Sequence, residues 1–268
     1  MEGYEVVEEQ KTAPKKDDTY KVLARKYRPQ TLDELVGQEH IATIFKNAIQ
    51  SNKIGHAYLL TGSRGIGKTS IARIIAKSLN CDHGPTISPC GVCDECKDIQ
   101  ESISINVKEI DGASNRGIDS MRDLQEELQF APTVGSKKRI VIIDEVHQIT
   151  REGFNALLKT LEDPPAHVMF IMATTDPQKV LPTILSRCQR FDLNRIPIPL
   201  IIGNLKNIIA KENSINPEPI IIDEQALYLI AKKADGGMRD ALSLLEQALS
   251  YGERTIRVDK VREIFGLI

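Results

Sequence analysis

Short apolar runs alternate with amphipathic stretches over residues 20–195 of the chain. The segments expected to form strands are 57–60, 107–110, 139–143, 168–173 and 189–193. The segments in which apolar residues recur three and four positions apart, as in helices, are 41–51, 71–76, 118–129 and 151–162. A strand as uniformly apolar as 139–143 is what a sheet buried on both faces requires. The pattern therefore predicts an α/β fold built on a parallel sheet.

The pattern changes at about Ile196, after which it predicts helices alone, over 199–212, 223–234, 238–250 and 258–265. Residues 1–19 are charged and lack either periodicity, so we expect a disordered leader there. A length of 268 residues suits two compact domains better than one. We therefore expect an α/β domain over 20–195 and a small helical domain over 196–268.

Composition narrows the functional classes without choosing among them. Hydrophobic residues make up 41% of the chain and charged residues 27%, with a net charge of -2. Such a balance is typical of a soluble protein, and it confines any nucleic-acid contact to a local patch. No apolar run approaches the roughly 18 to 20 residues of a membrane span, and the N-terminus has no apolar signal-peptide core. We expect a cytoplasmic protein with no membrane contact.

The strongest chemical signal is the glycine-rich stretch 62–70, GSRGIGKTS, which lies between a predicted strand and a predicted helix. It fills the pattern G-x-x-x-x-G-K-[ST], whose glycines let backbone N–H groups point at phosphate oxygens. Lys68 is expected to neutralise the β- and γ-phosphates, and Thr69 to offer a hydroxyl to magnesium. A chance glycine-rich turn is the alternative, which the flanking strand and helix disfavour. The expected nucleotide ligands here are Gly62, Gly65, Gly67, Lys68, Thr69 and Ser70.

Two acids follow the apolar strand 139–143, at the end of a strand where open α/β sheets bind ligands. Asp144 would hold magnesium, directly or through water, and Glu145 would polarise an attacking water. His147 is interpreted as a supporting or surface residue rather than a catalyst. Thr175, after the next apolar strand, could contact the γ-phosphate or its water, and a strand-end cap is an equally good interpretation.

Two further positions are candidates on weaker grounds. Val36 and the two residues after it could flank a flat ring, although an entry loop with a structural role explains them equally well. Arg239 lies at the start of the predicted helix 238–250, and a cation is unfavourable at a helix N-terminus. Arg239 is therefore a candidate phosphate ligand, and a surface charge is the alternative.

Four of the five cysteines fall within sixteen positions, at 81, 90, 93 and 96. The spacing C-x8-C-x2-C-x2-C suits one tetrahedral zinc ion with four thiolates and no position for water, which is a structural site. His83 competes with Cys81 as the fourth ligand, and an iron–sulfur cluster is the main rival to zinc. Nothing else in the chain indicates electron transfer. We expect a zinc module over 81–96, held by Cys81, Cys90, Cys93 and Cys96, and a buried apolar role for Cys188.

The chain resembles the N-terminal part of bacterial DNA polymerase III gamma/tau subunits, the AAA+ ATPase motors of the sliding-clamp loader. The motifs that carry the resemblance, in order, are LARKYRPQT, VGQEH, HAYLLTGSRGIGKTSIAR, PCGVCDEC, IIDEVH, FNALLKTLEDPP, ATTDPQK, LSRC and GGMRDALSLLEQA. The four-cysteine insertion discriminates most, since generic AAA+ proteins lack it.

The resemblance implies roles for individual residues. Lys68 and Thr69 match Walker A, and Asp144 and Glu145 match Walker B. Arg187 matches the arginine finger that enters the neighbouring subunit's ATP site.

Further matches concern the nucleotide and the metal. Thr175 matches sensor 1 and Arg239 matches sensor 2. Arg28 and Val36 match the part that surrounds adenine. The four clustered cysteines match the family's zinc ligands.

The resemblance implies an ATP-hydrolysing motor subunit that uses ATP, Mg²⁺ and structural Zn²⁺. Its partners would be other clamp-loader subunits in a hetero-oligomeric ring, the sliding clamp and, through the assembled complex, primed DNA. Family members usually continue into a helical collar domain that assembles the ring, and this chain ends near the close of its second domain. The alternatives are a non-hydrolysing scaffold subunit, which the intact Walker residues disfavour, and a DNA-junction helicase, which the cysteine cluster disfavours.

Overall fold

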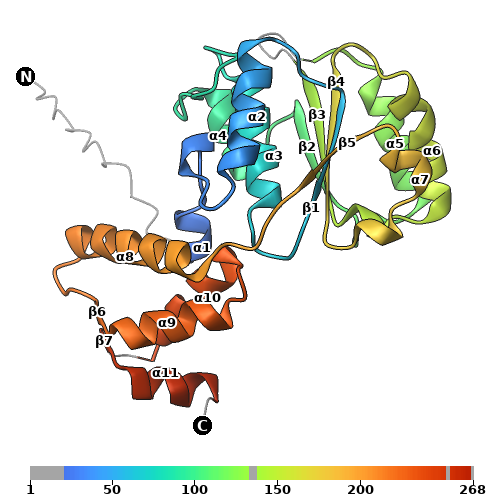
Figure 1. Cartoon of the computed structure of the whole chain (residues 1–268). Coiled ribbons are helices and arrows are strands. Elements are labelled where there is room, and N and C mark those ends of the chain that lie inside the picture. The colour runs from blue at the N-terminus through green and yellow to red at the C-terminus, as the bar shows by residue number, and fades with distance from the viewer. Residues whose placement is uncertain (1–20, 133–137, 252–253, 267–268) are drawn as a thin grey trace, which may run out of the picture.

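Five parallel strands form the central sheet in the order β2-β3-β4-β1-β5 (Figure 1). The computed structural model describes residues 21–132, 138–251 and 254–266, so the expected leader, 1–19, lies outside the described residues. The strands are β1 (Ala57–Thr61), β2 (Val107–Asp111), β3 (Arg139–Asp144), β4 (Val168–Thr174) and β5 (Gln189–Asp192). All five predicted strands are present, and the parallel sheet is confirmed.

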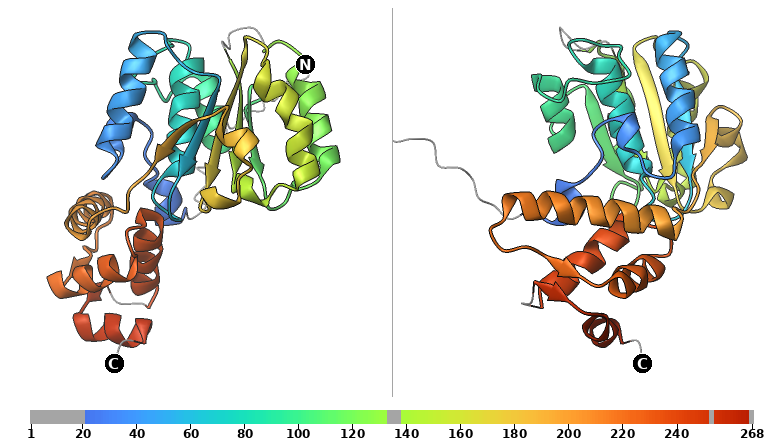
Figure 2. Two further views of the ribbon diagram at one scale, coloured as in Figure 1. Left: turned by 45° about the vertical axis from the view of Figure 1, so that its right-hand side comes forward. Right: turned by 60° about the vertical axis from the view of Figure 1, so that its left-hand side comes forward.

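Helices cover both faces of the sheet (Figure 2). One face carries α2 (Glu39–Gln50), α3 (Lys68–Asn80) and α4 (Asp94–Glu101), and the other carries α5 (Ile118–Leu128), α6 (Arg151–Glu162) and α7 (Pro182–Leu185). Side chains alternate along each strand, so Tyr58 and Leu60 join the core on the α2–α3 face while Leu59 joins the core on the α5–α6 face. The strands are apolar throughout because both faces are covered.

The second part of the chain is a helical unit that lies beside the carboxyl ends of the strands (Figure 1). Its helices are α8 (Ile198–Ile215), α9 (Glu224–Lys233), α10 (Met238–Leu249) and α11 (Val258–Phe265). The expectation of helices alone is wrong in one detail, since β6 (Ile221–Ile222) pairs in parallel with β7 (Thr255–Ile256). Strands of two residues are too short to produce a periodic pattern. None of the described helices is both long and apolar enough to cross a bilayer.

The first described segment packs on this helical unit. Helix α1 (Leu23–Lys26) places Leu23 in the apolar cluster of α8 to α11, and the backbone N–H of Leu23 donates to Glu246 Oε1 at 3.1 Å. Lys26 Nζ and Tyr27 Oη both donate to Glu212 Oε1, at 2.5 and 2.6 Å. The described part of the chain therefore begins on the helical unit, crosses to the sheet, and returns to the helical unit after β5.

Elements of a single turn were not predicted, because one turn carries no periodicity. They are α1, α7, and the 3-10 turns η1 (Leu32–Glu34), η2 (Val146–Gln148) and η3 (Pro177–Lys179). Helix α4, of eight residues, was also not predicted, and only two of its residues, Cys96 and Ile99, are buried apolar side chains.

Candidate nucleotide-binding site and cysteine cluster

A cavity of about 780 Å³ lies where the carboxyl edge of the sheet meets the helical unit. This volume falls within the range of small-molecule and cofactor sites, roughly 300 to 1,000 Å³. Its walls come from the glycine-rich loop, the ends of β2 and β3, the segment that follows α1, and helices α8 and α10. The predicted site residues that line it are Arg28, Val36, Gly65, Gly67, Lys68, Thr69, Ser70, Asp144, Glu145 and Arg239.

The glycine-rich loop forms the turn between β1 and α3. Gly62 has φ +142°, and a Cβ there would lie 2.5 Å from Ile66 Cδ1 and 2.8 Å from the Leu193 carbonyl oxygen. Gly67 has φ +112° and is the N-cap of α3, where no described side chain caps the helix. The first N–H groups of α3 are therefore available to an anion in the cavity.

Lys68 lines the cavity and is 6% exposed. Its Nζ donates to the carbonyl oxygens of Gly62 and Ser63 at 2.8 and 2.9 Å. Burial lowers the pKa of Lys68, against the opposing influence of the Glu145 and Asp144 carboxylates. A buried ammonium held by neutral carbonyls is well placed to bind an anionic ligand.

Thr69 and Asp144 meet although 75 residues separate them. Thr69 Oγ1 donates to Asp144 Oδ2 at 2.7 Å, and the Glu145 backbone N–H donates to Asp144 Oδ1 at 2.9 Å. A hydroxyl and a carboxylate in contact are hard oxygen ligands of the kind Mg²⁺ binds beside phosphates. The residues present therefore fit a magnesium ion.

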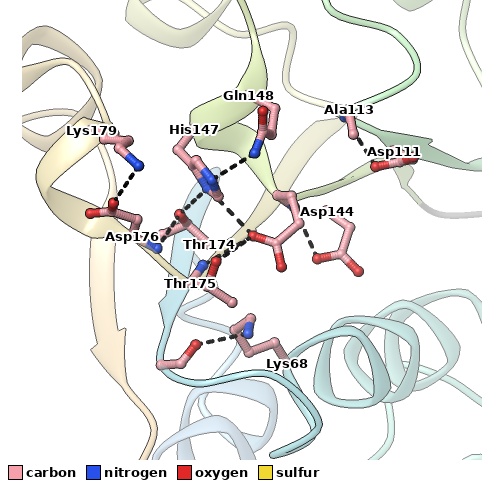
Figure 3. Close-up of polar contacts among 12 residues, drawn as sticks. Lys68, Asp111, Ala113, Asp144, His147, Gln148, Thr174, Thr175, Asp176 and Lys179 are labelled. Carbon is pink, nitrogen blue, oxygen red and sulfur yellow. Dashed lines mark hydrogen bonds and ion pairs between the residues drawn. The ribbon is translucent and has the colours of Figure 1, made fainter.

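Glu145 lies at a sharp turn, with φ +46°, directly after β3. Thr175 donates to Glu145 Oε2 from both the backbone N–H, at 3.1 Å, and Oγ1, at 2.9 Å (Figure 3). His147 Nδ1 lies 3.4 Å from the same oxygen, and the His147 side chain is 8% exposed. The neighbouring strands β3 and β4 thus bring Glu145 and Thr175 together. His147 is buried against Glu145 and is not a surface residue.

The helical unit touches the glycine-rich loop through α10. The Arg239 backbone N–H donates to the Gly65 carbonyl at 3.2 Å, and a Cβ on Gly65 would lie 2.7 Å from Asp240 Oδ2. Arg28 enters the cavity from the segment after α1, and its pKa is lowered by burial first and then by Arg73. Arg28 and Arg239 therefore add positive charge to the cavity from outside the sheet.

Asp111 is a cavity residue that the sequence analysis did not select. It ends β2 and pairs in register with Asp144 on β3. Hydrogen bonds from the Ser114 hydroxyl and the Ala113 backbone N–H lower its pKa. An acid at the end of a second predicted strand was the available signal, because the carboxyl ends of parallel strands share one edge.

Arg187 lies away from this cavity, just after α7. Its Nη2 pairs with Glu162 Oε1 at 2.6 Å, and its Nη1 donates to the Thr183 carbonyl at 2.6 Å. The fold does not bring Arg187 to this cavity of its own chain.

The four clustered cysteines converge beyond the end of α3. The Sγ atoms of Cys81, Cys90, Cys93 and Cys96 all lie within 4.8 Å of one another. Zn–S bonds of about 2.3 Å in a tetrahedron separate sulfurs by roughly 3.8 Å, so the set fits zinc.

Backbone groups also orient these thiols. The Cys93 and Cys90 N–H groups donate to Cys90 Sγ and Cys81 Sγ at 3.3 and 3.4 Å. The N–H groups of Cys93 and Val92 lower the pKa of Cys90 to about 6, which favours the thiolate that binds metal.

His83 lies near this cluster, and Cys188 lies outside it. The exposed His83 lies beside Cys81 and Cys90, and hydrogen bonds with these thiols raise its pKa. Cys188 is half-buried against the α5–α6 core, and burial raises its pKa to about 12. The contact with the apolar core agrees with the apolar role expected for Cys188, although the side chain is only partly buried.

Two family profiles match the chain. The profile described as "DNA polymerase III, delta subunit" matches residues 37–197. The profile described as "DNA polymerase III clamp loader subunit, ATPase lid domain" matches residues 201–254. Together they cover the sheet and most of the helical unit.

Individual proteins are similar over nearly the whole chain. The DNA polymerase III subunit tau of Salmonella typhimurium is 48% identical over 250 residues, covering 93% of this chain and 38% of that protein. The DNA polymerase III subunit tau of Bacillus subtilis is 47% identical, and the alignment covers 93% of this chain and 43% of that protein. The subunit gamma of Buchnera aphidicola subsp. Acyrthosiphon pisum is 45% identical over 249 residues, with coverage of 93% and 67%. The chain spans about two fifths of the length of these tau relatives.

Among solved structures, the Thermotoga maritima RuvB Holliday junction branch migration motor has a similar fold. The TM-score is 0.63 at 20% identity, and the alignment covers 90% of this chain and 72% of that one. At this identity the likeness concerns the arrangement of sheet, helices and helical unit.

Proposed function

Because this chain belongs to the family of DNA polymerase III gamma and tau subunits and has the AAA+ fold with its lid, we propose that it is an ATPase. Within a hetero-oligomeric clamp loader it would load the sliding clamp onto primed DNA. Its partners would be the other loader subunits and the clamp. Primed DNA in bacteria lies in the cytoplasm, which is where we place the protein.

One observation carries the proposal: Thr69 Oγ1 and Asp144 Oδ2 meet at 2.7 Å in the cavity, beside the Glu145 carboxylate. Thr69 and Asp144 would hold the magnesium ion, which lowers the repulsion of the phosphate oxygens toward a nucleophile. Lys68 and the open N–H groups of α3 would bind the β- and γ-phosphates. Glu145 would accept a proton from, and orient, the attacking water.

Contacts from outside the sheet would complete the site. Arg239 would bind phosphate as α10 approaches the loop, and Thr175 would contact the γ-phosphate or its water. Arg28 and Val36 would line the adenine end. Arg187 would act on the ATP of the neighbouring subunit, which agrees with its position away from its own cavity.

We propose that Cys81, Cys90, Cys93 and Cys96 hold one structural zinc ion. Their mutual distances and backbone hydrogen bonds support four-sulfur coordination. The domain boundaries that we propose are 20–195 for the ATPase domain, with its zinc module at 81–96, and 196–268 for the lid. Helix α1 belongs to the first of these in sequence and packs on the second.

The test is ATP hydrolysis by this chain alone and then with clamp-loader partner subunits, clamp and primed DNA. Slow hydrolysis alone and strong stimulation by the full mixture are expected, since an arginine supplied in trans is worth roughly 10³ to 10⁵ in rate. Nucleotide binding without hydrolysis in either case would favour the scaffold alternative. No binding of ATP would refute the proposal.

A further inference from the structure

His147 is a buried titratable side chain to which the proposed chemistry assigns no role. It lies on η2, two residues after Glu145, and the turn at Glu145 directs its ring back toward the end of β4 (Figure 3). Its Nδ1 lies 2.8 Å from Thr174 Oγ1 and 3.4 Å from Glu145 Oε2. Its Nε2 lies 3.1 Å from Gln148 Nε2.

These contacts select one form of the imidazole. The Gln148 amide, as it is oriented, presents its Nε2 donor to His147 Nε2, which then accepts and carries no hydrogen. The ring hydrogen therefore lies on Nδ1, where it donates to Thr174 Oγ1 at 2.8 Å and faces Glu145 Oε2 at 3.4 Å. Thr174 Oγ1 also accepts from the Asp176 backbone N–H at 3.0 Å.

The donors around Glu145 gather on one of its two carboxylate oxygens. Among the described residues, Thr175 N–H, Thr175 Oγ1 and His147 Nδ1 all approach Oε2. A carboxylate anchored through one oxygen presents the other in a defined direction. Accurate placement of this kind is what activation of a water by a general base requires.

We propose that His147, as the neutral Nδ1–H tautomer, is a positioning residue that orients the Glu145 carboxylate for water activation. This proposal rests on the proposed ATPase function. His147 and Thr175 both approach Oε2 of the carboxylate, so the removal of His147 leaves Glu145 held by Thr175 but less well directed. Loss of His147 should therefore lower the rate of ATP hydrolysis and leave the affinity for nucleotide unchanged.

Three variants test whether the Nδ1–H group of His147 orients the Glu145 carboxylate. In His147→Asn the amide nitrogen can take the place of Nδ1–H, whereas in His147→Gln it lies near the position of Nε2. We expect His147→Ala and His147→Gln to lower kcat about tenfold, with KM and Kd for ATP unchanged, because the ring N–H that faces Glu145 Oε2 at 3.4 Å is lost. His147→Asn should keep most of the wild-type kcat. Equal kcat values for the Asn and Gln variants would overturn the proposal.

A spectroscopic measurement keeps this test separate from that of the ATPase function. Long-range ¹H–¹⁵N NMR spectra of the full chain report each histidine tautomer, and the signal missing in His147→Asn identifies His147. The Nδ1–H tautomer is expected, and the Nε2–H tautomer or an imidazolium would overturn the proposal whether or not the protein hydrolyses ATP. A wild-type protein that binds ATP without hydrolysing it would instead refute the ATPase function.

Discussion

Lys68→Met is expected to abolish most nucleotide binding while leaving the fold intact. The substitution replaces a buried ammonium with an apolar group of similar length. Lys68 is 6% exposed and is held by the carbonyl oxygens of Gly62 and Ser63. Its charge is already removed from water in the free protein, so a bound phosphate gains the attraction without a new desolvation cost for the lysine.

The size of the loss follows from these contacts. Two unit charges 4 Å apart attract each other by about 4 kcal/mol at an effective dielectric constant of about 20. When Nζ turns toward a bound phosphate, its hydrogen bonds to the two loop carbonyls weaken, which reduces this attraction by about 1 kcal/mol. The remaining ~3 kcal/mol corresponds to a rise of about 100-fold in the Kd for ATP.

Lys77→Met is the matched control, since Lys77 lies on the same helix and is 2% exposed but does not line the cavity. Its Nζ donates to the side chains of Gln30 and Gln100. Titration with a fluorescent ATP analogue measures the Kd of each variant. Thermal unfolding shows whether each variant keeps its fold. The reasoning fails if Lys68→Met binds within about tenfold of wild type, or if Lys77→Met loses as much affinity.

Three further predictions concern the metal, the partner site and the lid. Purified protein should contain about one zinc per chain, with the metal lost in Cys81→Ser and kept in Cys188→Ser. Arg187→Ala should spare ATP binding and lower hydrolysis by the assembled complex by about 10³-fold or more. Glu212→Gln should lower the free energy of unfolding at pH 7 by about 1–2 kcal/mol, because Tyr27 and a half-exposed lysine lose a charged acceptor. Burial raises the pKa of Glu212, but the hydrogen bonds outweigh it and the net pKa lies below its ordinary value. The ionised form therefore stabilises the fold above its unfolded-state pKa, and the difference between wild type and variant should narrow as pH falls through the folded-state pKa.

Specific results would contradict each of these. Bound iron, or a metal that survives Cys81→Ser, would refute the four-cysteine zinc site. A loss of hydrolysis in Arg187→Ala that is equal in the isolated chain would place this arginine in its own site. Denaturant unfolding at several pH values tests Glu212, and a difference that widens in acid would reverse the sign of the argument.

The phosphate loop and the central strands of this protein could be predicted from short stretches of its sequence. The phosphate loop at 62–70 was evident because glycine and lysine must occupy fixed positions between a strand and a helix. The strands 139–143 and 168–173 were evident because a strand covered on both faces excludes polar residues. The family and the parallel-sheet fold that these motifs predicted are confirmed. The roles of individual site residues remain predictions.

The contacts between distant segments could not be predicted, because no periodicity along the chain records which strands are neighbours. Pairing of β3 with β4 places Thr175 against Glu145, and His147 packs beside Glu145, which decides between the supporting and the surface interpretation of this histidine. Packing of the lid brings the Arg239 backbone N–H to the Gly65 carbonyl. It also lets Glu212 of α8 accept a hydrogen bond from Lys26 of α1. Sequence determined which chemical groups this protein carries, since those depend on local backbone and residue type. Tertiary structure decided which groups meet, since burial and strand order join residues far apart in the chain.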